Sequence, residues 1–433
     1  MRWGKTLQVY LRFWQRCAYN AQATLPAHAV NCPECGLHTH IPTLSQGQEA
    51  CCPRCHHTLV RVEDNPFITP IALAVATLIV LACVYSMMFI TVTLTGVYAR
   101  ITLPTMMKTL FLQDFGFLAE VMFLFTFGTP LFFLLLCLYV FGALAFETPV
   151  LGLRSATRTM VRLREWIMVD VFFISTLVAY IKLQAVSQVE FGAAFWLLLA
   201  MSWLLIRTSV ATPEHWVYYQ IHRINGQTPI TDHTQHDTIC CSRCLYHRPI
   251  DEMECQVCGN RLFTRRPHSL RLSLAFLLAA AILYFPANLL PIMISANPMK
   301  TEISTILSGI LFMWRDGDKV IAAIIFSASI LVPSLKIISM ATLIASAHFG
   351  LPMPIHRMSR LYRVTEAVGR WSMIDIFVII ILMSAFHTPI ARVTPGPAAL
   401  YFCLVVLLTM LSAHYFDPRL LWDKHHNSLL KTH

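Results

Sequence analysis

Eight cysteines fall into four CxxC pairs, which are grouped two by two along the chain. The earlier pairs are "CPECG" at 32–36 and "CPRC" at 52–55, and the later pairs are "CSRC" at 241–244 and "CQVCG" at 255–259. Two tight turns that face each other offer four thiolates to one tetrahedral metal ion, and zinc is the usual occupant. The spacing predicts two zinc ribbons with one ion each, and the ligands are Cys32, Cys35, Cys52, Cys55, Cys241, Cys244, Cys255 and Cys258.

Cysteine supplies every ligand of both predicted sites, so neither site keeps an open position for catalysis. The ribbons are therefore expected to be structural or docking elements. A rubredoxin-like iron site is the alternative, because four cysteines suit both metals. Disulfides fit less well with the reducing cytoplasm in which the charge pattern, described below, places these segments. Cys51 and Cys240 stand beside ligand cysteines and are expected to be spare.

Two acids lie inside apolar segments that resemble each other. Asp170 belongs to "WIMVD" and Asp375 to "WSMID". An ionised carboxylate facing lipid costs about 2.5–3.5 kcal/mol, so both acids are expected to face the protein interior or water. At helical spacing each acid shares a face with the tryptophan four residues before it. The alternative interpretation is an acid at a helix start, favoured there by the helix dipole.

Two lysines strengthen the case for a polar site within the membrane. Lys336 lies deep in "SILVPSLKIISM" and needs a partner or a wet cavity, for which Asp375 on the next segment is the predicted candidate. Lys182 lies nearer the outer face, and its aliphatic chain can also extend so that the ammonium group reaches water. The repeat described below places His387 at the position matching Lys182, whereas Lys336 matches the apolar Phe133. The working site is therefore predicted in the second half of the chain.

Prolines interrupt two of the apolar segments. Pro130 and Pro333 each deprive the carbonyl four residues earlier of its usual donor, and those earlier residues are Thr126 and Ser329. Their hydroxyls can help to satisfy the local backbone, although a plain kink is the alternative. A third stretch, "FPANLLPIMISANP", contains Asn288 and is expected to be irregular and to be buried or line a cavity.

The elements that position these residues are apolar helices. The chain has 433 residues, of which 56% are hydrophobic and only 13% charged, about half the charged share of a soluble protein. Each predicted span approaches or exceeds the roughly 20 residues that cross a bilayer as a helix. Eight spans are predicted, at about 67–92, 117–146, 166–187, 191–211, 270–295, 319–347, 371–390 and 398–416. The N-terminus shows no pattern of a removable signal peptide.

Basic residues indicate the orientation of the spans. All but eight of the 33 Lys and Arg fall in the N-terminal segment, the linkers at 148–165 and 349–370, the central segment 207–271 and the tail. The positive-inside rule therefore places both termini and the central segment in the cytoplasm. The net charge of +10 is explained by a basic rim facing anionic lipid headgroups and requires no nucleic acid.

The chain is also a parallel repeat, in which "WIMVD" recurs as "WSMID" and each half starts from the same side of the membrane. We predict an all-α polytopic membrane protein of about eight transmembrane helices in two parallel-repeat halves, each with an N-terminal cytoplasmic zinc ribbon of four cysteines. The predicted domains are ribbon 1 with the N-terminal segment (1–66), transmembrane repeat 1 (67–220), ribbon 2 (221–268) and transmembrane repeat 2 (269–433).

Together, the duplicated CxxC ribbons, the "NLLP" run and the W-x-x-x-D segments resemble the paraquat-inducible protein A family, and most of all its LetA-type inner-membrane members. The resemblance implies an inner-membrane partner of a periplasm-spanning tunnel protein built from MCE domains, a pair thought to move phospholipid between the two membranes. The motif positions of the family correspond here to the eight ribbon cysteines, Asn288, Pro291, Asp170 and Asp375. The first half departs from it, with "SMMF" at 86–89 where "NLLP" would fall.

The resemblance implies a component of a lipid transport system that maintains the outer membrane, and not an enzyme. The chain contains no GxxxxGK[ST], GxSxG or HExxH motif. Coupling to protons is compatible with an Asp and a Lys inside the spans, and passive loading of lipid is equally compatible. Two alternatives stay open, namely an efflux protein for small molecules or drugs, and a membrane-anchored redox or metal sensor that uses the cysteine sites.

Overall fold

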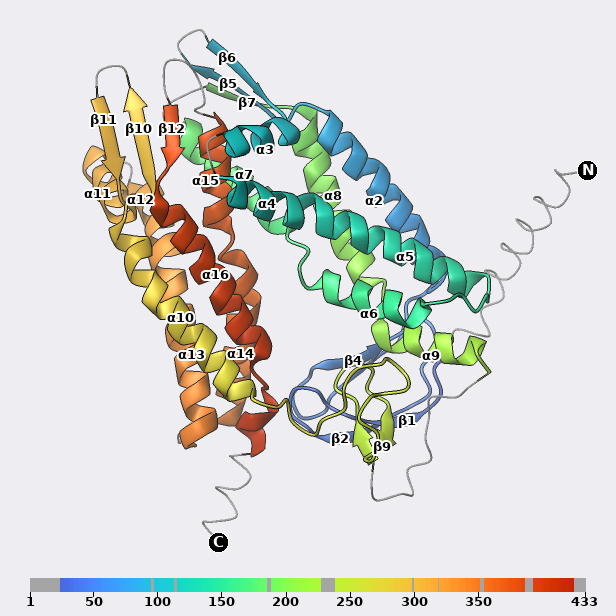
Figure 1. Ribbon diagram of the computed structural model, residues 1–433. Helices are drawn as coiled ribbons and strands as arrows, with labels where there is room; N and C mark the ends of the chain where they lie inside the picture. The colour runs from blue at the N-terminus through green and yellow to red at the C-terminus, as the bar shows by residue number, and fades with distance from the viewer. Residues whose placement is uncertain are drawn as a thin grey trace, which may run out of the picture. The chain divides into compact units, whose positions relative to one another are not determined.

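The computed structural model describes residues 24–94, 97–112, 115–184, 188–226, 238–297, 300–317, 319–350, 354–385 and 392–423 (Figure 1). The chain divides into two compact units. Unit 1 consists of Met1–Ile79, Thr129–Ile167 and Trp203–Pro267, and it contains both cysteine-rich segments. Unit 2 consists of Val80–Gly128, Met168–Ser202 and His268–His433.

Unit 1 holds three short antiparallel hairpins and the helices beside them. The strands are β1 (His28–Asn31), β2 (His38–Ile41), β3 (Glu49–Cys51), β4 (Thr58–Arg61), β8 (Thr238–Cys240) and β9 (His247–Pro249). They pair as β1–β2, β3–β4 and β8–β9. The packed helices are α5 (Thr129–Ala145), α6 (Leu153–Arg164) and α9 (Glu214–Ile224). In α6 the buried residues recur at helical spacing while arginines occupy the other positions, which is the pattern of a helix with one packed face.

Four long helices of unit 2 lie side by side (Figure 1). They are α10 (Ser269–Leu289), α13 (Val332–Phe349), α14 (Ile355–Trp371) and α16 (Pro397–Tyr415). The seam between α10 and α16 is made by serines. The Ser273 hydroxyl donates to the Ser412 carbonyl oxygen and the Ser412 hydroxyl donates to the Ser273 carbonyl oxygen, both at 2.8 Å. Such small polar residues let membrane helices approach closely and bond across the interface.

Two more helices of this unit pack against each other, α7 (Val169–Gln184) and α15 (Ile374–Ala385). They occupy corresponding places in the two halves of the chain. Phe172 of α7 and Phe377 of α15 meet edge to face, with ring centres 5.3 Å apart, and both side chains are fully buried. The repeat therefore brings the two segments that begin with Asp170 and Asp375 together in the core of unit 2.

Each half of the chain contains a π-helical turn in its second long apolar segment, shortly before the proline. In the first half α4 (Gly116–Phe123) runs through η2 (Leu124–Gly128) into α5, and in the second α12 (Lys319–Phe326) runs through η3 (Ser327–Leu331) into α13. Proline lacks an N–H and its ring crowds the carbonyl four residues earlier, so a wider turn relieves both problems. The sequence predicted an irregularity here, and the structure shows it to be a π-turn that contains Thr126 and Ser329.

Each half also contributes a three-stranded antiparallel sheet, which the sequence analysis did not predict. One has the order β6–β5–β7 and the other β11–β10–β12. Their strands are β5 (Ile90–Leu94), β6 (Val97–Ile101), β7 (Gln188–Phe191), β10 (Met293–Asn297), β11 (Lys300–Ser304) and β12 (Arg392–Pro395). The short helices α3 (Leu103–Leu112) and α11 (Ile306–Asp316) follow β6 and β11. The expected spans at 67–92 and 270–295 were therefore too long, because their outer ends are strands.

Within the described residues, seven helices are long and apolar enough to cross a membrane. They are α2 (Ile68–Ser86), the run Gly116–Ala145, α8 (Ala193–Val210), α10, the run Ser329–Phe349, the run Ile355–Ala385 and α16. The remaining expected span, at 166–187, corresponds to α7, which has 16 residues and includes Asp170 and Lys182. The elements of the two halves follow in the same order, so the predicted helical fold with a parallel repeat is confirmed.

Candidate metal centres and a buried polar site

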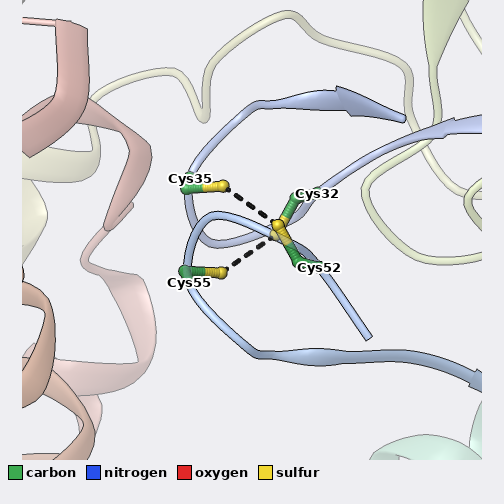
Figure 2. A group of neighbouring side chains, drawn as sticks. All are labelled: Cys32, Cys35, Cys52 and Cys55. Carbon is green, nitrogen blue, oxygen red and sulfur yellow. Dashed lines mark hydrogen bonds between the residues drawn. The ribbon is translucent and has the colours of Figure 1, made fainter. Parts of the chain in front are cut away.

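The four cysteines of the first ribbon converge on one point, as Figure 2 shows. The Sγ atoms of Cys32 and Cys55 are 3.5 Å apart, and those of Cys35 and Cys52 are 3.6 Å apart. All four ligand atoms lie within 4.8 Å of one another, and all four residues are buried. Two CxxC turns from separate hairpins thus supply the predicted set of donors.

The second ribbon repeats this geometry. Cys241 and Cys258 are 3.6 Å apart at Sγ, and Cys244 and Cys255 are 3.5 Å apart. Four thiolates around one zinc ion at about 2.3 Å would place their sulfur atoms about 3.8 Å apart in a tetrahedron. The buried donor sets of both ribbons therefore fit a tetrahedral metal ion, and the prediction that the eight cysteines form two clusters of four, each able to hold a metal ion, is confirmed.

Each CxxC turn closes through the residue that follows its second cysteine. These residues are Gly36, His56, Leu245 and Gly259, whose φ angles are +71°, +57°, +61° and +69°. In the first turn the Gly36 N–H donates to the Cys32 carbonyl oxygen at 2.9 Å, and the other three turns repeat the bond. The left-handed backbone turns the chain back so that both cysteines point inward. Glycine adopts a positive φ angle without strain, which explains why glycine follows the second cysteine in two of the four turns.

Ribbon 2 is held against α6 and α9 by hydrogen bonds to its backbone carbonyls. Arg158 of α6 donates from Nη1 to the Gly259 carbonyl oxygen at 2.8 Å. His222 of α9 lies with Nε2 3.2 Å from the Val257 carbonyl oxygen. Both carbonyls belong to residues adjacent to the ligand Cys258. The turn that carries two of the candidate metal ligands thus also presents acceptors to the two helices.

A buried stack of His28, His215 and Tyr246 joins the two ribbons and α9. The ring centres are 4.9 Å apart between the histidines and 4.3 Å apart between His215 and Tyr246. His215 donates from Nδ1 to the Cys244 carbonyl oxygen at 2.6 Å. Burial, with the nearby His28 adding to it, lowers the pKa of His215 to about 3. His215 is therefore neutral at physiological pH and serves as a packing and hydrogen-bonding residue.

Charged residues form a network of ion pairs at the junction of α6, α9 and ribbon 2. Arg243 lies 3.0 Å from Glu165 and 3.7 Å from Glu214, and Arg164 lies 4.0 Å from Glu214. Burial raises the pKa of the Glu214 carboxyl, and the two arginines act against this rise. The ion pairs join ribbon 2 to α6 and α9. They therefore fix the ribbon on these helices more than they stabilise the ribbon or either helix alone.

Lys336 is buried inside unit 2, with only 3% of its surface exposed. It lies on α13, and its Nζ is 3.4 Å from the carbonyl oxygen of Gly369 on α14. A Cβ at position 369 would lie 3.4 Å from Nζ and 3.6 Å from Cε, at ordinary van der Waals contact with the lysine side chain. Gly369 belongs to the last turn of α14, where carbonyls lack helical partners and a cation is favoured by the dipole.

Asp375 lies just beyond this point, in the first turn of α15, and is also buried. The first turn of a helix favours an acid because its N–H groups are unsatisfied and the dipole is positive there. The expectation that each Asp shares a helix face with the preceding tryptophan was wrong. Trp371 is the last residue of α14 and Trp166 precedes α7, so a break separates each tryptophan from its acid.

Lys336 contacts the last turn of α14, and Asp375 lies in the first turn of α15, just after the break between these two helices. The contact that the structure gives the ammonium group is with the Gly369 carbonyl oxygen, and the ion pair with Asp375 stays a prediction. Asp170 takes the matching place in the first turn of α7 but is only half-buried. Sequence reasoning missed Gly369, whose role depends on a neighbouring helix.

The other predicted polar residues form local hydrogen bonds. Thr126 donates to the Met122 carbonyl oxygen at 2.7 Å and lies 2.8 Å from the Tyr85 hydroxyl. Asn288 donates from Nδ2 to the Tyr284 carbonyl oxygen at 2.8 Å, within a helix that continues to Leu289, so the irregular end expected there begins later. Ser329 is buried in η3.

Tyr284 and Ser334 form a second hydroxyl pair, 2.9 Å apart, which resembles the pair of Tyr85 and Thr126. In each half, therefore, a tyrosine of the first long helix reaches a hydroxyl within four residues of the proline in the second long apolar segment. Two predictions fall outside this description, because the side chain of Lys182 and the whole of His387 lie outside the described residues.

Comparison with known proteins adds the evolutionary context. The family model described as "Paraquat-inducible protein A" matches residues 68–222 and 270–426, one segment in each half of the chain. The chain belongs to the paraquat-inducible protein A family. The resemblance predicted from the ribbons and the W-x-x-x-D segments is thus confirmed. Both cysteine-rich segments lie outside the matched ranges.

Curated members of the family align along almost the whole chain. The chain is 35% identical over 405 residues to the intermembrane transport protein PqiA of Escherichia coli K12, covering 92% of this chain and 96% of the relative. It is 32% identical over 396 residues to the lipophilic envelope-spanning tunnel protein A of the same strain, covering 91% of each. A probable intermembrane transport protein of Haemophilus influenzae is 27% identical over 411 residues. No solved structure matches the chain significantly.

Proposed function

We propose that this protein is the inner-membrane component of a system that moves phospholipid to or from a periplasm-spanning tunnel protein made of MCE domains. It acts as a transporter component and not as an enzyme. Support comes from its relatives, which are named as an intermembrane transport protein and as an envelope-spanning tunnel protein. The seven helices suited to crossing a membrane in the described part of the chain fit a multi-pass protein embedded in the bilayer.

The observation that carries the proposal is the buried ammonium group of Lys336 at the junction of α14 and α15. A cation inside a bundle of membrane helices is costly and marks a pathway or a relay more often than a structural contact. Helix ends that meet within the membrane provide dipoles and unsatisfied backbone groups, which transporters use to bind ions and polar substrate groups. Lys336 and Asp375 together supply groups that gain or lose a proton as such a path opens.

The two cysteine clusters hold zinc in this proposal, one ion in each ribbon. Both sites are closed, all four donors are buried thiolates, and no position is left for a substrate. Their task is to fold the ribbons and to fix ribbon 2 on α6 and α9 through Gly259 and Val257. We place the ribbons and both termini in the cytoplasm, because the basic linkers lie on that side by the positive-inside rule.

Lipid binding by the purified full-length protein tests the substrate class. The protein is extracted into detergent, exchanged into nanodiscs with a photoactivatable phospholipid at low mole fraction, illuminated and digested. We expect cross-links to map to peptides of unit 2 around α13–α15, and excess unlabelled phospholipid should compete for them. Competition by a cationic drug but not by phospholipid would favour efflux and would overturn the proposal.

Metal analysis under anaerobic conditions tests the ribbons separately. We expect about two zinc equivalents per chain and no visible absorption band, as four-cysteine structural zinc sites predict. Iron with a visible band would point to electron transfer and to a sensor. This outcome is independent of the lipid experiment, so the failure of one does not decide the other.

A further inference from the structure

Three histidines gather where ribbon 1 meets ribbon 2, outside both cysteine clusters. His38 and His40 alternate along β2 and are exposed, and His247 opens β9 of the other ribbon. The ring centre of His38 is 5.5 Å from that of His40 and 5.7 Å from that of His247. His38 therefore contacts one imidazole of its own ribbon and one of the other ribbon.

Within each of these two ring pairs the spacing is close to the one that a shared metal ion imposes, and His40 must turn toward the other two rings, because the ligand nitrogens of the three histidines do not all lie within 4.8 Å of one another as they stand. Two imidazoles bound to one zinc ion at about 2.0–2.1 Å and near the tetrahedral angle have ring centres about 5 Å apart. The two ring pairs also stand nearly perpendicular, at 82° each, so the rings do not stack face to face. Because His40 is exposed, its ring can turn about its own torsions on a fast timescale to complete a set of three ligands.

The central ring is already held in the tautomer that a metal ligand needs. His38 Nδ1 lies 2.8 Å from Asn31 Oδ1. A side-chain amide oxygen only accepts hydrogen bonds, so Nδ1 carries the proton and the lone pair of the neutral ring lies on Nε2. Metal-binding histidines typically donate their other ring N–H to an oxygen in this way, which fixes both tautomer and orientation.

Asn31 also ties this arrangement to the second ribbon. Its backbone N–H donates to Cys240 Sγ at 3.4 Å. Cys240 is not one of the four ligands of its ribbon, and it ends β8, the strand that pairs with β9. The contact therefore fixes β1 of ribbon 1 against the hairpin that carries His247. A cysteine expected to be spare from its position in the sequence thus holds the two halves of the histidine group in register.

We propose that His38, His40 and His247 form a third metal site, which takes a divalent transition-metal ion such as zinc and bridges the two ribbons. Imidazole suits Zn²⁺, Cu²⁺ and Ni²⁺. Two of the three ligands are exposed, whereas both four-cysteine clusters are buried, so this ion exchanges with solvent while the cysteine-bound ions stay in place. The site does not depend on the proposed lipid transport, and it would make the contact between the ribbons responsive to free metal.

The test is a zinc-binding measurement on the full-length protein, purified in detergent without a polyhistidine tag. A mild chelator removes loosely held metal, two retained equivalents confirm that the four-cysteine sites are filled, and Zn²⁺ is then titrated by equilibrium dialysis with elemental analysis. We expect one further equivalent. In His38→Asn and in His40→Asn its dissociation constant should rise at least tenfold, and Asn31→Ala should weaken it by about 10–100-fold through loss of the orienting bond.

His57→Asn is the matched control. His57 is a partly exposed histidine of the same ribbon, paired with Glu34 at 3.1 Å and not part of the three-histidine group. It should leave the exchangeable equivalent unchanged. All variants must retain two tightly held ions, which shows that the ribbons are folded. Absence of an exchangeable equivalent, or its persistence with unchanged affinity in both His38→Asn and His40→Asn, would overturn the proposal.

Discussion

Gly396 stands where no other residue fits, and replacing it by alanine should destabilise unit 2. It follows β12 and precedes α16, directly against the backbone that leaves α10. A Cβ there would overlap the Pro291 carbonyl oxygen and lie 2.6 Å from the Pro291 carbonyl carbon. These atoms belong to backbone and cannot rotate away as a flexible side chain would. The alanine variant must therefore separate the two segments.

That separation breaks two backbone hydrogen bonds. The Gly396 N–H donates to the Ile292 carbonyl oxygen at 2.9 Å, and the Ala398 N–H donates to the Pro291 carbonyl oxygen at 3.2 Å. At about 0.5–1.5 kcal/mol each, their loss lowers the free energy of unfolding by about 1–3 kcal/mol before any strain is counted. The matching glycine of the first half, Gly192, meets the backbone of Met88 in the same way, so Gly192→Ala should behave alike.

The assay is unfolding of the purified protein in detergent, followed by tryptophan fluorescence, with membrane abundance measured by blot. Gly309→Ala is the control, because Gly309 lies in the middle of α11 and a Cβ there would meet nothing within 4 Å. An alanine at that position should be neutral or stabilise by about 0.5–1 kcal/mol, since glycine is unfavourable inside a helix. If Gly396→Ala is as stable to unfolding as Gly309→Ala, the close approach of the two backbone segments is contradicted.

Three further predictions concern the ribbons, the helix seam and the topology. Replacing Cys32 and Cys35 together by Ser should remove one metal equivalent and lower protein abundance, because metal binding is folding free energy in such small modules; unchanged metal content would refute the ligand assignment. Ser273→Ala and Ser412→Ala should each lower the free energy of unfolding by about 0.6 kcal/mol, the average for hydrogen bonds between membrane helices, because each removes one hydroxyl donor of the reciprocal pair, and unchanged stability of both variants would contradict the pair. In intact cells, Arg315→Cys should react with a membrane-impermeant thiol reagent and Arg360→Cys should not, and the reverse pattern would invert the proposed orientation.

The ligand sets of the ribbons could be predicted from sequence because the constraint is local. One CxxC turn supplies two metal donors, and two such turns together supply the four donors of a closed tetrahedral site. The helix-start positions of Asp170 and Asp375 could be foreseen as an alternative for a similar reason, since an acid in the first turn is favoured by the backbone of its own helix.

The outer sheets could not be separated from the spans that precede them. "MISAN" at 293–297 and "ITVTL" at 90–94 continue an apolar segment without a charge, so hydropathy merged helix and strand, and the prolines before "MISAN" indicated an irregular end but not a strand. The two glycines at an offset of 204, Gly192 and Gly396, were the available signal for a close backbone approach. The surroundings of Lys336 were harder still to predict from the sequence. Its neighbour Gly369 is 33 residues away and is recognisable only once α13 and α14 are packed.

The most direct test of the charged site in unit 2 is complementation of the envelope-barrier defect of a strain that lacks this protein. Asp375→Asn keeps the shape of the side chain and removes its charge, and Lys336→Met keeps most of the stem and removes the ammonium group. With membrane levels equal by blot, both variants should fail to restore the barrier, whereas Asp170→Asn should retain most of the activity because that acid is half-buried and its half has Phe133 in place of the lysine. Full complementation by well-expressed Asp375→Asn and Lys336→Met would contradict the proposal that these charges take part in transport.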